Sequence, residues 1–191
     1  MKQLILASAS PRRKKLLEQF GLSVKVVPSN IDEKLNPRLK PKKQAEQLSL
    51  EKAQTVAKHY KEAIVLAADT LVSIDNDILG KPKDEQEAKR MLRKLSGKTH
   101  TVITGFTIIN TITRKSMTDS VETKVIFRKL TEKEIKTYIK KENTLDKAGA
   151  YGIQTWGALL VEKITGDFFN VVGLPISSVI PHLKKFGLDV L

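Results

Sequence analysis

The sequence predicts an α/β protein with a mixed β-sheet. Short apolar β-type runs alternate with helical segments along most of the 191 residues. Two long β-rich segments, 100–110 and 116–130, follow each other directly, which favours a hairpin within the sheet. With 40% hydrophobic residues the chain can bury a core of its own. We therefore expect a single domain over residues 1–191, either compact or made of two small lobes that share a core.

Apolar runs and helix-end signals define the first half of the chain. Residues 3–7 are typical of a short buried strand, and a helix is predicted from Pro11 to about residue 20, closed by Gly21. The next predicted segments are an extended piece at 23–27, a polar loop at 30–43 with Pro37 and Pro41, and a helix at about 43–60. The apolar run at 63–74 predicts a buried strand, which Asp69 and Thr70 interrupt.

Capping signals place the later helices. Asp84 with Glu87, and Thr131 with Glu134, are capping-box patterns for helices that end near Gly97 and residue 141. The other predicted elements are a turn at 75–77 into 78–79, the paired strands at 100–110 and 116–130, a strand at 159–164, a turn at 165–167 and a helix from Pro175 that Pro181 bends.

Composition narrows the classes of function. The formal net charge of +13 favours anionic partners, but the lysines are spread along the whole chain, which is typical of a solvated surface. The chain has no cysteine, so disulfides, cysteine zinc sites and thiol nucleophiles are excluded. The apolar stretch at residues 4–7 is too short for a secretory signal and no run is long enough to span a bilayer, so we expect a cytoplasmic protein.

The junction between the first strand and the first helix carries an anion-binding pattern. Ser10 is a favoured N-cap and Pro11 a favoured first helical residue, so backbone N–H groups and the positive end of the helix dipole are expected here. Arg12 and Arg13 are unfavourable at that end of an isolated helix, which indicates that something negative binds. Arginine can hold phosphate oxygens with two hydrogen bonds. The alternative is an ordinary cap followed by solvated cations.

Asp69 is the strongest chemical signal in the chain. A carboxylate inside an apolar β-type run is costly to bury unless a cation, a metal or several donors accompany it. Its natural roles are a ligand to Mg²⁺ and a general base for an attacking water. The alternative is an Asp at a strand end that caps a turn. Glu33, in the polar loop, is a weaker second acidic candidate, and the alternative for it is a solvated loop residue.

Lys52 lies in the apolar stripe of its predicted helix, between Leu48 and Val56. Such a lysine either extends its amine to the rim or faces a cleft that holds an anion. Two more segments, the turn at 80–82 with Lys81 and the small-residue loop at 146–154, are ordinary turns by default, although their glycines could let the backbone approach a ligand closely.

Taken together, these motifs resemble the Maf family of nucleotide pyrophosphatases. The matching pieces run in family order over nearly the whole chain: Leu6-Ala7-Ser8-Ala9-Ser10-Pro11-Arg12-Arg13, Lys52, Ala68-Asp69-Thr70, Gly80-Lys81-Pro82, Leu95-Ser96-Gly97 with His100, Thr104-Gly105, residues 146–154 and Val172-Gly173-Leu174-Pro175. The chain departs from the pattern at Thr155-Trp156-Gly157, where members usually have glycine after the glutamine. The departure concerns the conformation of this loop more than the activity.

The resemblance implies an α/β fold in which a bent mixed sheet, flanked by helices, forms two lobes around a cleft, as in Maf and ITPase-like proteins, usually as a homodimer. It also implies hydrolysis of a nucleoside triphosphate to the monophosphate and pyrophosphate, with Mg²⁺ or Mn²⁺. Asp69 would be catalytic and, with Glu33, a metal ligand. The implied substrate-binding residues are Ser8, Ser10, Arg12, Arg13, Lys52, Thr70, Lys81 and Gln154. A membrane or nucleic-acid partner is not expected.

Three positions point to a pyrimidine substrate through the same resemblance. The family branch that resembles dTTP/UTP pyrophosphatases carries Arg12, Thr70 and Gln154 at their positions, whereas the 7-methyl-GTP branch carries tryptophan in place of Arg12. Gln154 can match the O4 and N3–H edge of uracil or thymine, or it can simply hold its own loop together. The remaining alternatives are a purine-directed pyrophosphatase and a non-enzymatic regulator of septum formation that binds nucleic acid. A regulator has no need of Asp69 in an apolar strand.

Overall fold

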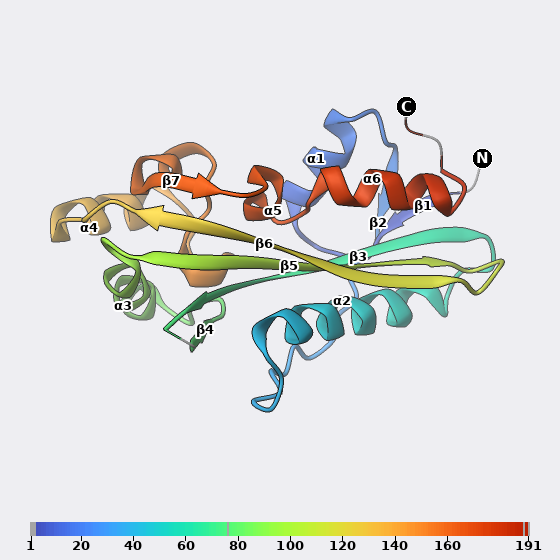
Figure 1. Ribbon diagram of the computed structural model, residues 1–191, viewed down its shortest axis with the longest axis horizontal. Helices are drawn as coiled ribbons and strands as arrows, with labels where there is room; N and C mark the ends of the chain where they lie inside the picture. The colour runs from blue at the N-terminus through green and yellow to red at the C-terminus, as the bar shows by residue number, and fades with distance from the viewer. Residues whose placement is uncertain (1–2, 76, 189, 191) are drawn as a thin grey trace. The chain divides into compact units, whose positions relative to one another are not determined.

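The computed structural model describes residues 3–75, 77–188 and 190, which form an α/β protein with a mixed seven-stranded sheet (Figure 1). The strand order is β2-β1-β3-β5-β6-β7, and β4 pairs with β3. The chain divides into two compact units. Unit 1 comprises residues 1–69, 104–121 and 173–191, and unit 2 comprises residues 70–103 and 122–172. The chain therefore passes between the units four times, at 69–70, 103–104, 121–122 and 172–173.

Unit 1 carries the parallel part of the sheet. Its elements are β1 (Gln3–Leu6), α1 (Pro11–Gln19), β2 (Val24–Val26), α2 (Pro41–Ala57), α6 (Ile176–Lys185) and parts of β3 (Ala63–Ile74), β5 (Thr99–Asn110) and β6 (Ser116–Phe127). β1 pairs in parallel with both β2 and β3. Parallel strands covered on both faces read as continuous apolar runs. Figure 1 shows this cover, with α2 on one face and α1 and α6 on the other.

Helix α2 lies unusually close to the sheet of unit 1. Its Ala53 and Val56 join a buried cluster with Ile5 and Val65. At Gly105 on β5, an added Cβ would lie 2.3 Å from the backbone carbonyl of Ala45 on α2, so only glycine fits there. The helix begins at Pro41, because the fixed φ of proline suits the first helical position. The sequence pattern alone had placed Pro41 in the preceding loop.

Unit 2 contains the antiparallel additions to the sheet. Its own elements are β4 (Asp77–Leu79), α3 (Glu85–Leu95), α4 (Glu132–Lys141), β7 (Val161–Thr165), α5 (Phe168–Val172) and the 3₁₀ helices η1 (Ala148–Ala150) and η2 (Thr155–Leu160). β4 runs antiparallel to β3, and β7 runs antiparallel to β6. The predicted capping box of Thr131 and Glu134 is confirmed, and the Asp84 side chain accepts a hydrogen bond from the Glu87 N–H.

Three short helices were not predicted. η2 occupies 155–160, so the last strand begins at Val161 and not at 159. η1 falls inside the small-residue loop, where Gly149 takes a positive φ of 66°. α5 begins after Asp167, whose Oδ1 accepts from the N–H groups of Phe169 and Asn170. Segments of one or two turns carry too little periodicity to be read from sequence. Asn76, in the predicted turn at 75–77, lies outside the described residues.

A neutral aromatic cluster lies in the core of unit 2. His100 is 2% exposed, its Nε2 is hydrogen-bonded to the Tyr151 hydroxyl at 2.7 Å, and both rings stack edge-on against Phe127. Burial lowers the pKa of His100 to about 4 and raises the pKa of Tyr151. The cluster is thus held by a hydrogen bond between uncharged groups.

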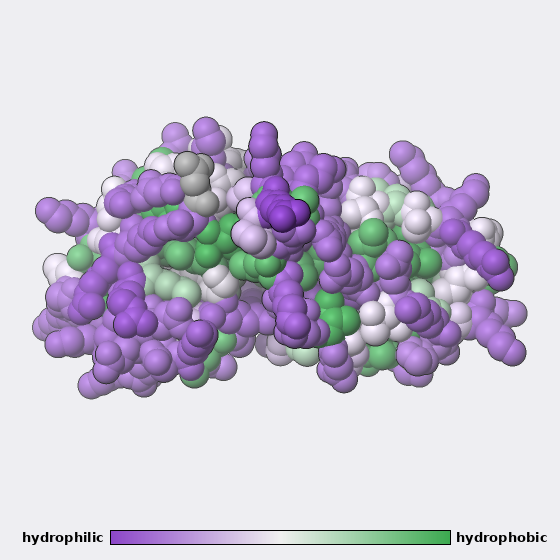
Figure 2. All heavy atoms as spheres, turned by 90° about the horizontal axis from the view of Figure 1, so that it is seen from below, coloured by the Kyte–Doolittle hydropathy of each residue, from purple (hydrophilic) through white to green (hydrophobic). Residues whose placement is uncertain are grey.

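The surface is mostly polar. Figure 2 shows a face on which hydrophilic side chains are spread widely, with small hydrophobic areas between them. This spread agrees with lysines that are distributed along the sequence. Within the described residues, no helix combines the length and the apolar character needed to cross a membrane.

Candidate functional site

The turn from β1 into α1 builds the first part of the candidate site. Ser8 is 6% exposed, and its Oγ accepts a hydrogen bond from the Ser10 backbone N–H at 3.2 Å. Ser10 is the N-cap of α1, with extended backbone, and its own side chain makes no capping bond. Pro11 follows, and the first turn contains no acidic side chain. The helix start therefore offers N–H groups and a positive dipole end to an anion.

Arg13 is buried directly behind this turn. Its Nη1 donates to Ser8 Oγ at 3.0 Å, and its Nε donates to the Gly173 carbonyl at 2.8 Å. Burial lowers the pKa of the guanidinium, while the negative charges of Asp69 and Glu33 oppose that shift. Arg13 therefore ties the helix start to a residue 160 positions later and also adds positive charge near two carboxylates.

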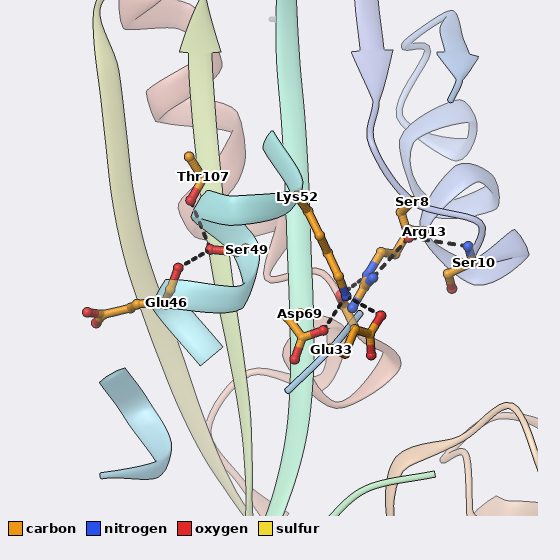
Figure 3. Close-up of polar contacts among 10 residues, drawn as sticks. Ser8, Ser10, Arg13, Glu33, Glu46, Ser49, Lys52, Asp69 and Thr107 are labelled. Carbon is orange, nitrogen blue, oxygen red and sulfur yellow. Dashed lines mark hydrogen bonds and ion pairs between the residues drawn. The ribbon is translucent and has the colours of Figure 1, made fainter. Parts of the chain in front are cut away.

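The second part of the site is an ion-paired group of three side chains: Lys52 on α2, Asp69 on β3 and Glu33 in the loop before α2 (Figure 3). Lys52 Nζ donates to Asp69 Oδ1 and lies 2.8 Å from Glu33 Oε1. The side chains of Lys52 and Asp69 are each 7% exposed, whereas that of Glu33 is 39% exposed. The lysine amine thus does not extend to the rim. It neutralises the buried carboxylate, whose desolvation would otherwise be costly.

Polar contacts fix α2 against the sheet one turn before Lys52. Ser49 Oγ is hydrogen-bonded to Thr107 Oγ1 on β5 at 2.8 Å and donates to the Glu46 carbonyl (Figure 3). Together with the close approach at Gly105, these bonds set where Lys52 leaves the helix. Sequence reasoning missed Ser49 and Thr107, because a serine and a threonine in predicted regular elements carry no signal of their pairing.

The other predicted site residues lie on different segments. Arg12 is half-buried in the first turn of α1. Thr70 follows Asp69 on β3 and is half-buried. In unit 2, Lys81 is exposed in the turn after β4, and Gln154 is exposed as the N-cap of η2. The structure thus gathers Ser8, Ser10, Arg13, Glu33, Lys52 and Asp69 within unit 1.

Packing within unit 2 holds the loops that carry Lys81 and Gln154. The Gly149 N–H donates to the Gly80 carbonyl at 3.0 Å, beside Lys81. A Cβ on Gly157 would lie 1.6 Å from the Gly152 carbonyl oxygen, so η2 folds tightly against the loop before it. Thr155 takes a positive φ of 53° and hydrogen-bonds through Oγ1 to Glu142 Oε1. This is the position at which the chain departs from the expected glycine.

The residues present suit an oxygen-preferring divalent metal. Mg²⁺ is usually held by one or two carboxylates, with waters and substrate phosphates completing its shell. Asp69 and Glu33 supply two carboxylates on one ammonium group. Over residues 3–75, 77–188 and 190, no three His, Cys, Asp or Glu side chains converge. The donor set therefore fits a metal that arrives with phosphate ligands and does not provide a complete protein cage.

A protein family and several curated proteins match this chain over nearly its whole length. Residues 3–186 match the family described as Maf-like protein. A dTTP/UTP pyrophosphatase of Clostridioides difficile is 49% identical over 183 residues, covering 96% of this chain and 94% of that protein. Proteins of the same name from Bacillus cereus and Caldicellulosiruptor saccharolyticus are 47% and 45% identical, each covering 100% of this chain and 98% of the relative. A solved structure of the Staphylococcus aureus Ham1 protein aligns with a TM-score of 0.47 at 11% identity, over 66% of this chain and 72% of that one.

Proposed function

The chain belongs to the Maf family, and on that premise we propose that it hydrolyses dTTP and UTP to the nucleoside monophosphate and pyrophosphate. The proposal is supported by full-length relatives named dTTP/UTP pyrophosphatase at 45–49% identity. The observation that carries it is the buried Asp69 carboxylate on β3, which faces cationic side chains beside a helix N-terminus. Carboxylate, cations and helix start are the groups that a phosphoryl-transfer site requires.

We assign the chemistry to unit 1. Asp69 is the proposed catalytic residue, which activates the attacking water, holds the metal, or does both. Asp69 and Glu33 are the proposed metal ligands, supported by their convergence on one ammonium group. When bound, Mg²⁺ or Mn²⁺ would neutralise the phosphate oxygens and polarise the reacting phosphorus. Ser8, Ser10, Arg12, Arg13 and Lys52 are the proposed binding residues for the triphosphate, where positive charge stabilises the pyrophosphate leaving group.

We extend the proposed substrate-binding set to Thr70, Lys81 and Gln154. Lys81 is exposed in a short turn and would add charge for the triphosphate. Gln154 is exposed at the start of η2, so its amide can offer both an acceptor and donors to a pyrimidine edge. A site built to hydrogen-bond one base edge rejects the wrong edge strongly, because polar groups would be left unpaired.

The decisive experiment is pyrophosphate release from a panel of normal and modified nucleoside triphosphates with Mg²⁺ or Mn²⁺. We expect dTTP and UTP to exceed dATP and GTP in kcat/KM. Changing Gln154 to Glu together with Thr70 to Gln should remove that preference while pyrophosphate is still released. Equal efficiency on purine and pyrimidine substrates by the wild type would refute the base assignment but not the pyrophosphatase activity.

The remaining parts of the proposal concern the domain, the oligomeric state and the cellular location. We propose that both units form one functional domain over residues 1–191, supported by the four passages of the chain between them. We further propose a homodimer that acts in the cytoplasm, where nucleoside triphosphates are found, without a nucleic-acid or membrane partner. Sedimentation equilibrium of the purified protein tests the dimer.

A further inference from the structure

The Lys52 ammonium occupies the position between the two proposed metal ligands. It donates to Asp69 Oδ1 and is 2.8 Å from Glu33 Oε1. With its side chain 7% exposed, it is screened far less than a surface lysine. A divalent cation held by the same two carboxylates would lie close to this amine. The metal and the ammonium group therefore compete for the same negative charge.

The formal charges around the two carboxylates show how strongly the ammonium group opposes metal binding. Asp69 and Glu33 contribute two negative charges, and Lys52 and Arg13, whose charge both carboxylates feel, contribute two positive charges. Arg12, whose positive charge also acts on Arg13, adds to this sum, so the cluster without substrate carries no net negative charge. A divalent ion that approaches it gains no net attraction and meets the nearby ammonium at short range. A triphosphate changes the balance, because its oxygens offer Lys52 another partner.

The two cations differ in how they are held. Arg13 is fixed by hydrogen bonds to Ser8 Oγ and to the Gly173 carbonyl. Lys52 has a flexible four-carbon stem and is held by ion pairs to the two carboxylates. Ser49, one turn earlier, holds the helix backbone on β5. A change of partner at Lys52 can therefore occur by rotation of its side chain while α2 stays in place.

We propose that Lys52 is a placeholder cation: it fills the metal position in the free protein, keeps divalent metal out, and transfers to the triphosphate when metal and nucleotide arrive together. This inference rests on the proposed function for the identity of the nucleotide, while its metal-binding part stands on unit 1 alone. It makes Lys52 a positioning residue for the metal in addition to a phosphate ligand.

The test measures Mn²⁺ binding to the nucleotide-free protein by electron paramagnetic resonance of free Mn²⁺. The proteins are wild type, Lys52→Met, Lys52→Gln and the control Lys58→Met, which removes an exposed lysine at the end of the same helix. We expect wild type and control to bind Mn²⁺ equally weakly and both Lys52 variants to bind it roughly tenfold tighter or more, because a charge a few ångströms away is removed. A residue with only a structural role would give weaker binding on removal.

Lys52→Gln retains a hydrogen-bond donor for Asp69 and carries the test if Lys52→Met does not fold. Wild-type protein that binds Mn²⁺ as tightly as the Lys52 variants, or variants that bind it more weakly, would overturn the inference. Pyrophosphate release by the wild type is measured alongside. Its absence with every nucleotide would contradict the proposed function, whereas tighter Mn²⁺ binding by the variants would still support the placeholder role.

Discussion

The two units bury polar side chains in opposite ways. In unit 1, the Asp69 carboxylate is buried against the Lys52 ammonium group, so the pair is charged. In unit 2, His100 and Tyr151 share a hydrogen bond, and burial lowers the pKa of the imidazole to about 4, so the pair is neutral near pH 7. Burial alone therefore does not mark a functional site. A buried charge that needs a counter-charge indicates chemistry, and a buried neutral pair indicates packing.

The largest effect is expected at the charged pair. Asp69→Asn should lower kcat by about 10²–10⁴-fold, because an amide neither accepts a proton nor binds metal as a carboxylate does. The protein should stay folded and lose about 1–3 kcal/mol of unfolding free energy, since Lys52 keeps Glu33 and an amide oxygen as partners. Steady-state kinetics at saturating metal and urea unfolding measure the two effects. Near-wild-type turnover would rule out the proposed role of Asp69.

A comparison of two glycines tests how rigidly α2 is packed on the sheet of unit 1. Gly105→Ala should cost about 3 kcal/mol or more, because the new Cβ would lie 2.3 Å from the carbonyl of Ala45 and α2 must shift. Gly80→Ala in unit 2 is the control: an added Cβ meets nothing within 4 Å, so the change should stay within about 0.5 kcal/mol. Chemical denaturation of both variants gives the values. Similar stabilities would mean that α2 adapts freely.

The neutral pair predicts a pH dependence. The pKa of His100 is about 4 in the folded protein and about 6.5 in the unfolded chain. The unfolded chain therefore binds a proton more readily, so the contribution of neutral His100 to the unfolding free energy is complete above pH 6.5 and is lost as the pH falls toward 4. Between pH 7 and 4.5, wild type should lose about 2–3 kcal/mol more unfolding free energy than His100→Gln. His59→Gln, at an exposed histidine, should behave like wild type. Urea titrations at both pH values measure the unfolding free energies. Identical losses of unfolding free energy in all three proteins would exclude a buried neutral His100.

The smallest effects separate binding from packing. Arg13→Ala and Lys81→Ala should each reduce kcat/KM for dTTP about tenfold, as expected for one charge-assisted phosphate contact. Only Arg13→Ala should also lower the melting temperature, because Arg13 is buried and Lys81 is exposed. Low-salt binding to DNA should be unchanged in both. Unchanged kinetics with weaker DNA binding would favour the nucleic-acid-binding alternative.

The sequence was sufficient to predict features that follow from the physical chemistry of a single residue or a short motif. Asp69 was conspicuous in an apolar run, and the capping box at Thr131 follows a local rule that the structure confirms. The partners of Lys52 could not be predicted, because they depend on how α2 is placed against β3. The hydrogen bond from Arg13 to the Gly173 carbonyl could not be predicted either, because every residue has a backbone carbonyl and the residue type does not show which one accepts. Such contacts arise only from tertiary packing.

The repeated passage of the chain between the units affects how the protein is made. Unit 1 needs residues 1–69 and also 173–191, so a ribosome must synthesise residues 70–172 before the last piece of this unit exists. The bond from Arg13 to Gly173 cannot form earlier. Early folding domain by domain, the usual route for a growing chain, is therefore closed to unit 1. A nascent chain halted before residue 173 would carry Asp69 and Lys52 without the segment that completes their surroundings.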